Sequence, residues 1–278
     1  MLSTKIARLQ KFLRESKSVL VALSGGVDSS VLAYVAHEAL GSAMEAVCIV
    51  SDCFAPEDIA CARAVAKQAG FHLHELEIDP LDDMSIRSNP QDRCYICKKR
   101  LFARIISLGQ SRDIHMVLEG THDDDSLDDR PGFRALQELG VHSPLLDAGF
   151  TKAEIRKLAE NFKLPCAARM SEACYLTRFP HGQLITRERI ALVREAEAFM
   201  HLLGFDLCRV RIHGDMARIE IPSVRIADAV TRHGARIACE FRRMGFRYVA
   251  MDLDGYRPAD SQAEAPSAHP IPPQKGPA

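Results

Sequence analysis

The stretch SGGVDSS, residues 24–30, constrains most tightly what this chain can fold into. An apolar run, VLVAL at 19–23, comes directly before it, and a helical pattern, DSSVLAYVAHEAL at 28–40, follows. A strand, a glycine turn and a helix in this order expose backbone N–H groups at a helix N-terminus, which is a favourable site for an anion. The lysine of a Walker A loop is missing. The stretch therefore predicts a phosphate-binding loop of another kind, with a plain helix cap and turn as the simpler alternative.

The same alternation of apolar runs and helical patterns continues along the first 165 residues. It predicts an α/β fold with a parallel sheet and crossover helices. Thr151 and Glu154 can form a capping box at the start of the last helix. The expected strands are MEAVCIVSD (44–52), HLHELEID (72–79) and DIHMVLEGT (113–121), and the expected helices are PEDIACARAVAKQAG (56–70) and TKAEIRKLAENFK (151–163).

A smaller α+β unit is predicted near the C-terminus. A helix at 186–205 precedes two strands within 208–222 that join across His213-Gly214-Asp215. A helical stretch interrupted near Gly234 then leads to a last strand at 246–256. The expected division is a phosphate-loop domain at 1–165, a cysteine-containing loop at 166–185, a small α+β domain at 186–256 and a disordered Pro- and Ala-rich tail at 257–278.

The balanced charge of the chain narrows the class of partners. Its 278 residues include 36 basic and 37 acidic side chains, which argues against a protein that wraps nucleic acid. The N-terminal stretch has charges among its apolar positions, unlike a signal peptide, and no segment has the length of a membrane span. We expect a soluble cytoplasmic protein without a membrane partner.

Nine cysteines, an odd number, do not indicate a disulfide framework. Cys48, Cys208 and Cys239 lie in apolar stretches and are expected to be core residues. Cys94 and Cys97, in DRCYIC at 92–97, have the spacing of a metal half-site, an iron–sulfur ligand pair or a redox pair. A segment without any ligand is the plain alternative.

Cys174 belongs to a loop, CAARMSEACYLTRFPHG at 166–182, with Arg169 and Arg178 nearby in sequence. Positive neighbours lower the pKa of a thiol and favour the thiolate, the form that attacks an electrophile or ligates a metal. Cys174 is therefore a candidate nucleophile or ligand, against the alternative of a packed loop residue.

The stretch at 24–30 resembles the PP-loop of the ATP pyrophosphatase superfamily. Those enzymes cleave ATP between the α and β phosphates, transfer AMP to an oxygen of the substrate, and hold the departing pyrophosphate in this loop. The resemblance implies ATP and Mg²⁺ as cofactors, with positioning and charge neutralisation dominating the chemistry. It assigns the phosphates to Ser24, Gly25, Gly26, Val27, Asp28, Ser29 and Ser30.

Further motifs resemble the LarE family of ATP-dependent sulfur transferases, over most of the chain. They are DRCYICK (92–98), GTHDDDSLDDRPG (120–132), SPLLDAGFTKAEIR (143–156), ACYLTRFPHG (173–182), HGDMARIEI (213–221) and YVAMDLDGYR (248–257). This family adenylates the carboxylates of pyridinium-3,5-biscarboxylic acid mononucleotide and converts them to thiocarboxylates for the nickel-pincer cofactor of lactate racemase. The resemblance implies a small nucleotide substrate, a sulfide or other sulfur donor, and a homo-oligomer.

Two kinds of sulfur donor occur in the family. In one, a cysteine at the position of Cys174 gives up its own sulfur and becomes dehydroalanine. In the other, three cysteines hold a 4Fe–4S cluster whose remaining iron binds the sulfide. This chain has Cys94 and Cys97 as well as Cys174, so the resemblance favours the cluster version. A zinc site with His181, a redox pair, and Cys166 as a substitute ligand stay open.

The resemblance also assigns residues around these two sites. At the nucleotide it implies Gly120, Thr121, Lys152 and Arg156, with a solvated cationic face as the alternative that is favoured for Arg156. From the acidic cluster at 123–129, Asp124 is a candidate for Mg²⁺. At the anionic substrate it implies Arg178, Arg211 and Glu197, with a surface position as the alternative for Glu197.

This chain departs from the family pattern in two places. Residues 167–170, AARM, stand where members commonly carry Trp-x-Lys-Pro ahead of the cysteine, and His122 replaces a common Asn. Two other functions stay open. A tRNA thiolation enzyme of the same superfamily should carry a basic face for RNA, and a nucleotide-binding regulatory protein would bind ATP without releasing AMP.

Overall fold

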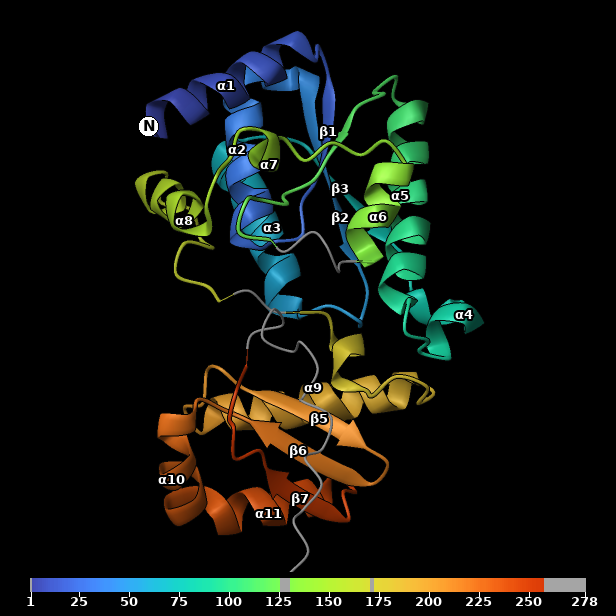
Figure 1. Ribbon diagram of the computed structural model, residues 1–278, viewed down its shortest axis with the longest axis vertical. Helices are drawn as coiled ribbons and strands as arrows, with labels where there is room; N and C mark the ends of the chain where they lie inside the picture. The colour runs from blue at the N-terminus through green and yellow to red at the C-terminus, as the bar shows by residue number, and fades with distance from the viewer. Residues whose placement is uncertain (1, 126–130, 171–172, 258–278) are drawn as a thin grey trace, which may run out of the picture.

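The computed structural model describes residues 2–125, 131–170 and 173–257. Within them the chain forms a four-stranded sheet and a three-stranded sheet, which Figure 1 shows one above the other along the longest axis. None of the described helices is long and apolar enough to cross a bilayer. The tail that we expect to be disordered lies, from residue 258 on, outside the described residues.

The larger sheet is parallel, which confirms the expectation from the alternating pattern. Its order is β3-β2-β1-β4, and every neighbouring pair runs in the same direction. The carboxyl ends of all strands therefore lie at one edge, where parallel sheets usually bind ligands. The strands are β1 (Val19–Ala22), β2 (Met44–Val50), β3 (Leu73–Glu77) and β4 (Val117–Leu118).

Helices cover both faces of this sheet (Figure 1). Side chains alternate along β1, so Val19 and Val21 enter one apolar core and Leu20 enters the other. The first core is covered by α1 (Leu2–Glu15), α2 (Val27–Leu40), α3 (Pro56–Ala69), α7 (Pro144–Asp147) and α8 (Lys152–Asn161), and the second by α5 (Arg93–Ser111) and α6 (Pro131–Glu138). The predicted capping box of α8 is present: Thr151 and Glu154 each accept a hydrogen bond from the other's backbone N–H.

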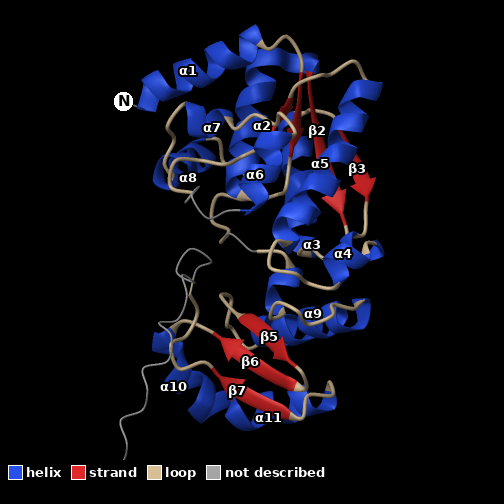
Figure 2. Ribbon diagram, turned by 45° about the vertical axis from the view of Figure 1, so that its right-hand side comes forward, coloured by secondary structure: helices blue, strands red, loops and turns tan. Residues whose placement is uncertain are grey.

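The smaller sheet contains β5 (Arg209–His213), β6 (Met216–Glu220) and β7 (Tyr248–Met251). β5 and β6 are antiparallel and join across the predicted turn at Gly214, whereas β7 pairs with β6 in parallel. The predicted interruption near Gly234 is a π-helical turn, Ala229–His233, between α10 (Ile226–Asp228) and α11 (Gly234–Arg243). Figure 2 shows α9 (Arg187–Leu202) and α11 beside this sheet. The two helices contact each other, since the rings of Phe199 and Phe241 lie 6.3 Å apart.

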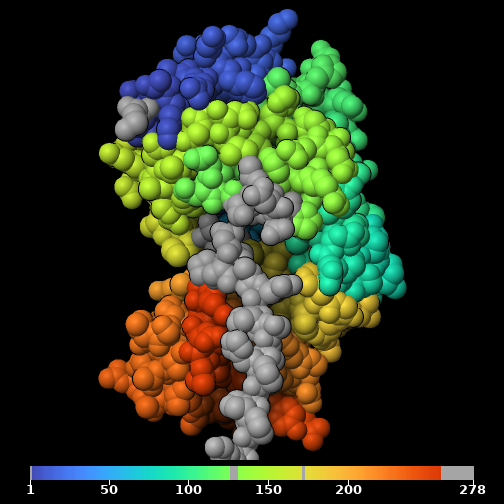
Figure 3. All heavy atoms as spheres, in the orientation of Figure 1, coloured from blue at the N-terminus to red at the C-terminus, as the bar shows by residue number. Residues whose placement is uncertain are grey.

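The apolar core of the smaller sheet extends into the first half of the chain. Cys53 and Ala55, between β2 and α3, belong to it, as do Leu81 and Ile86 near the short helix α4 (Met84–Arg87). In Figure 3 the residues around the start of α5 lie against those that precede and begin α9. The backbone agrees, since the N–H of Ile185 donates to the carbonyl of residue 87 at 2.9 Å. The boundaries of the expected domains stay a prediction.

Two glycines bring other segments against the phosphate loop. Gly25 has a φ of +83°, and a Cβ there would lie 1.9 Å from the carbonyl oxygen of Asp58 in α3. A Cβ at Gly120 would lie 2.8 Å from the backbone nitrogen of Ser29 in α2. In both cases the neighbour is backbone, so a larger residue fits only if the loop moves.

We predict that Gly120→Ala destabilises the protein by about 1–3 kcal/mol, the usual cost of overpacking, because its methyl group meets the first turn of α2. Gly234→Ala is the matched control, since a Cβ there has its nearest neighbour at 3.9 Å and lies in a helix. Urea unfolding of both variants measures the difference. Equal stability of Gly120→Ala and the unaltered protein would contradict the close approach.

Candidate active site at the carboxyl edge of the parallel sheet

The phosphate loop connects β1 to α2. Gly26 caps α2 without any side-chain hydrogen bond to the first N–H groups of the helix. The hydroxyls of Ser24 and Ser29 lie 3.0 Å apart, and the hydroxyl of Ser29 donates to the carbonyl of Gly26 at 3.2 Å. The loop is thus held by its own side chains. An uncapped helix N-terminus after a glycine turn offers N–H donors to phosphate oxygens.

Lys152, at the start of α8, reaches the phosphate loop. Its ammonium group donates to both carboxylate oxygens of Asp28, at 2.7 and 2.6 Å. The Nε2 atom of His122, which replaces the family's usual Asn, lies 3.6 Å from the same carboxylate. Asp124 accepts the backbone N–H of Lys152 at 2.5 Å, so its role in binding Mg²⁺ stays a prediction. Asp28 is a carboxylate of the loop itself, with the hard oxygens that Mg²⁺ requires.

A buried carboxylate that no motif marks, Glu119, organises the other side of the loop. It is 7% exposed and accepts hydrogen bonds from the N–H and the hydroxyl of Thr121, at 3.0 and 2.9 Å, and from the hydroxyl of Ser143. These bonds fix the turn that presses Gly120 against Ser29. Gly120 and Thr121 therefore lie beside the loop, and their contact with a nucleotide stays a prediction.

The three candidate cysteines come together between α5 and the loop before α9. Cys94 and Cys97 occupy the first turns of α5, where residues three apart share a face. Cys174 directly precedes a short 3-10 turn, Tyr175–Arg178. Each of these thiols is within electrostatic range of at least one of the others, which makes them neighbours in space.

Two buried polar side chains hold the Cys174 loop against the start of α5. Arg93, 3% exposed, donates to the carbonyl of Leu176 at 2.9 Å and to the side-chain oxygen of Asn89. Asn89 in turn donates to the carbonyl of Pro180 at 2.7 Å. The position of Cys174 relative to the cysteine pair therefore depends on contacts that the spacing of cysteines does not reveal.

A fourth thiol, Cys53, lies in the same place. It follows β2, is 1% exposed, and its carbonyl accepts a hydrogen bond from the N–H of Tyr175 at 2.9 Å. Cys53 contributes to the raised pKa of Cys97, and Cys174 contributes to the raised pKa of Cys53, so the three thiols are neighbours. We call Cys53, Cys94, Cys97 and Cys174 the cysteine group. Cys53 has no other cysteine of the group near it in sequence, so no spacing motif includes it.

Burial dominates the acidity of these thiols. It is the main cause that raises the pKa of Cys97 to about 12 and the pKa of Cys53 to about 12, and it also raises the pKa of Cys174. Two arginines act on Cys174 in the opposite direction without overcoming burial. The expectation that positive neighbours keep Cys174 as a thiolate is wrong here. Arg169, one of the arginines expected to do so, instead donates to the carboxylate of Asp58 at 2.8 Å.

The donors of the cysteine group fit an iron–sulfur cluster in their chemistry, because such clusters are held by thiolates. Among residues 2–125, 131–170 and 173–257, no three His, Cys, Asp or Glu side chains are arranged to enclose a metal ion. Metal binding would require the thiols to lose their protons. His181, the alternative zinc ligand, is exposed, with Nδ1 3.0 Å from the carbonyl of Pro90. Cys166 contacts Cys61 instead.

Arg178 and Glu197 form a buried ion pair at the base of the Cys174 loop. Their two contacts are 2.8 and 3.1 Å long, and the side chains are 1% and 3% exposed. Glu197 also accepts the N–H of Val210 at 2.8 Å, which links the loop through α9 to β5. Arg211 donates to the carbonyl of Thr177 at 2.8 Å. The surface alternative for Glu197 is therefore wrong, and contact of these three residues with substrate stays a prediction.

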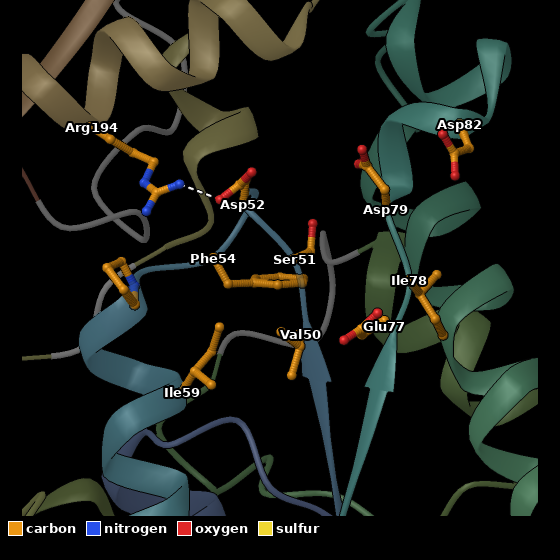
Figure 4. Close-up of a pocket in the computed structure, with 11 residues that line it drawn as sticks. Val50, Ser51, Asp52, Phe54, Ile59, Glu77, Ile78, Asp79, Asp82 and Arg194 are labelled. Carbon is orange, nitrogen blue, oxygen red and sulfur yellow. Dashed lines mark hydrogen bonds and ion pairs between the residues drawn. The ribbon is translucent and has the colours of Figure 1, made fainter.

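A cavity of about 460 Å³ opens beside the cysteine group, at the carboxyl ends of β2 and β3. Figure 4 shows Ser51 and Phe54 just after β2 and Ile78 just after β3, with Arg194 reaching toward Asp52 from the side. Its carboxylates favour amine, hydroxyl or cationic groups over phosphate. They belong to Asp52, Glu77, Asp79 and Asp82.

The fold and the loop define the class of protein: it contains a PP-loop α/β domain, and residues 4–121 match the model of the NAD synthase family. The chain is 35% identical to pyridinium-3,5-bisthiocarboxylic acid mononucleotide synthase of Lactiplantibacillus plantarum, over 92% of this chain and 93% of that protein. It is 34% identical to an uncharacterized protein of Synechocystis sp. (92% of this chain, 96% of that one). It is 29% identical to one of Methanocaldococcus jannaschii (91% and 97%). The chain belongs to the family of the L. plantarum synthase, the LarE family.

We predict that Glu197→Ala lowers the free energy of unfolding by about 3–5 kcal/mol, because it leaves the guanidinium of Arg178 buried without its partner. Glu195→Ala is the matched control on the same helix, since Glu195 forms an exposed ion pair with Arg243 and should change stability little. Denaturant unfolding of both variants provides the comparison. If the two variants lose the same stability, the ion pair of Arg178 and Glu197 does not stabilise the Cys174 loop against α9.

Proposed function

We propose that the protein is an ATP-dependent sulfur transferase that takes part in nickel-pincer cofactor synthesis. It adenylates the carboxylates of pyridinium-3,5-biscarboxylic acid mononucleotide and converts them to thiocarboxylates for the cofactor of lactate racemase. Membership of the LarE family supports this reaction. The observation that carries the proposal is that residues 53–58, which begin in the cysteine group, end against the phosphate loop, where the carbonyl of Asp58 abuts Gly25.

The activation step fits the phosphate loop. A carboxylate oxygen of the substrate attacks the α-phosphorus of ATP, the bond to the β-phosphate oxygen breaks, and pyrophosphate leaves. The uncapped N–H groups at the start of α2 can hold the departing charge, and the ammonium group of Lys152 adds to it. Asp28, paired with Lys152, is the carboxylate that we assign to Mg²⁺.

The sulfur step fits the cysteine group. Cys94, Cys97 and Cys174 would hold a 4Fe–4S cluster, which when bound supplies an iron without a cysteine ligand as a place for sulfide. A nucleophilic sulfur displaces AMP from the acyl carbon, and AMP leaves with the bonding electrons. Cys53 is buried, and Cys97 and Cys174 are partly buried against the core of the smaller sheet, which limits the water that could hydrolyse the activated acyl group.

The expected domain division belongs to the same proposal. The segment 1–165 would bind and cleave ATP, the loop at 166–185 would present Cys174, and the segment 186–256 would contact the substrate or other copies of the chain. The cores support a close connection between these parts, since Cys53 packs with residues of the smaller sheet.

The cysteine-sacrificing version of the reaction is the second candidate. In it the sulfur of Cys174 attacks the acyl carbon and displaces AMP, and elimination then breaks its Cβ–S bond, which leaves dehydroalanine in the chain. The neighbouring thiols of Cys94 and Cys97 support a ligand role instead, because a cluster needs several thiolates close together and a sacrificial cysteine does not. A tRNA thiolation enzyme is the third candidate. The balanced charge of the chain speaks against RNA, whose anionic backbone favours a basic face.

We predict that Cys94→Ala and Cys97→Ala each lose the iron and acid-labile sulfide that the unaltered protein binds on anaerobic reconstitution. Both variants should still release pyrophosphate from ATP and substrate, because the phosphate loop is intact. Neither should form more than one thiocarboxylate per chain. Iron analysis, pyrophosphate release and mass spectrometry of the product measure the three quantities.

The control for this experiment is Cys208→Ala, which removes a buried cysteine of the smaller sheet's core. It should bind iron and turn over as the unaltered protein does. Full multiple turnover by Cys94→Ala and Cys97→Ala would contradict the assignment of these residues as cluster ligands, but it would not contradict the transferase reaction.

A further inference from the structure

Cys61 and Cys166 form a pair of thiols outside the cysteine group. Cys61 lies in α3, and Cys166 lies in the segment that follows α8. Their thiols are neighbours in the first apolar core, and the two residues are 6% and 0% exposed. The proposed reaction uses neither of them, so the pair calls for another explanation.

Hydrogen bonds at two points hold the segment 162–169 along α3, one before Cys61 in the helix and one after it. Near the start of α3, Asp58 accepts a hydrogen bond from Arg169 at 2.8 Å. Near its end, Gln68 donates to two carbonyls of the segment at 3.1 and 3.3 Å. Asp58, Cys61 and Gln68 share a helix face by their spacing. These hydrogen bonds therefore keep Cys166 beside Cys61, as a disulfide between them requires.

Cys166 also contacts the phosphate loop. Its sulfur lies beside the hydroxyl of Ser30, the last residue of SGGVDSS. Ser30 is 0% exposed, and its hydroxyl has no hydrogen-bond partner among the described residues. A chemical change at the sulfur of Cys166 therefore acts directly on a buried residue of the loop.

These contacts make Cys166 the acidic member of the pair. The neighbouring thiol of Cys61 is the main cause that lowers the pKa of Cys166 to about 7; burial opposes it, and Ser30 and Arg169 assist. The neighbouring thiol of Cys166, together with burial, raises the pKa of Cys61. A thiolate beside a neutral thiol is the arrangement that peroxides oxidise to a disulfide.

We propose that Cys61 and Cys166 are a site of reversible oxidation by peroxide, and that their disulfide weakens nucleotide binding at the phosphate loop. The Cys166 thiolate attacks a peroxide oxygen, the O–O bond breaks, and a sulfenic acid and hydroxide form. The thiol of Cys61 attacks the sulfenic sulfur, and the displaced hydroxide takes the thiol proton and leaves as water. The disulfide turns the sulfur beside Ser30 from a thiolate into a neutral group bonded to α3, and so changes the packing against the loop. The proposal rests on the proposed function only in taking ATP as the ligand of the loop.

The experiment treats the reduced full-length protein with hydrogen peroxide, blocks free thiols and maps the peptides by mass spectrometry. We expect one peptide pair joined through Cys61 and Cys166. Calorimetry with ATP alone, without the pyridinium substrate, should show a rise in Kd of about tenfold that dithiothreitol reverses. Absence of the joined peptides overturns the proposal, as does their formation without a change in Kd.

Cys61→Ala is the matched control, because it keeps Cys166 and Ser30 but cannot form the disulfide. Its Kd for ATP should be unaffected by peroxide, and Cys61→Ser tests the same point if the alanine variant does not fold. An equal loss of affinity in these variants also overturns the proposal, since it would assign the effect to other cysteines. Failure of the reduced protein to bind ATP would contradict the proposed function instead, and peptide mapping would still decide whether the disulfide forms.

Discussion

The contact between Gly25 and the carbonyl of Asp58 sets the position of everything that surrounds the phosphate loop. It holds the first turn of α3 against the loop with no room for a side chain. At the other end of the same short segment, the carbonyl of Cys53 binds the N–H of Tyr175 and so fixes the Cys174 loop. The segment 53–58 therefore connects the phosphate loop, where we propose that ATP is cleaved, to the cysteine group.

Burial and charge act in opposite directions on the thiols, and burial prevails in the cysteine group. Cys53, Cys97 and Cys174 all have a raised pKa, so in this structure they are protonated at neutral pH. A metal ion or an electrophile must therefore displace a proton before any of them reacts or ligates. Beneath the phosphate loop the balance is reversed at Cys166, because the neighbouring thiol of Cys61 lowers its pKa against the effect of burial. One chain thus contains thiols that differ in acidity.

The features that the sequence predicts well are local ones. The strand, glycine turn and helix around SGGVDSS, the capping box at Thr151 and the hairpin at Gly214 each depend on a few consecutive residues, and the structure contains all of them. The parallel order of the sheet followed from the alternation of these local patterns.

The features that the sequence does not reveal are contacts between distant segments. Cys53 joins the cysteine group, and Glu119 organises the turn at Gly120, although no spacing marks either residue. The acidity of Cys174 was predicted from arginines nearby in sequence, but Arg169 turns to α3 and the depth of the site raises the pKa. Side-chain direction and burial arise only from packing, which a motif does not encode.

The most direct test of the central claim, that the cysteine group carries a sulfur that is not part of the chain, follows the origin of the transferred atom. The anaerobically reconstituted protein is incubated with ATP, the pyridinium biscarboxylate nucleotide and heavy-isotope-labelled sulfide, and the product and the intact chain are then weighed. The account predicts a labelled thiocarboxylate, several turnovers and an unchanged mass of the chain. An unlabelled product together with a chain that has lost one H₂S would contradict it.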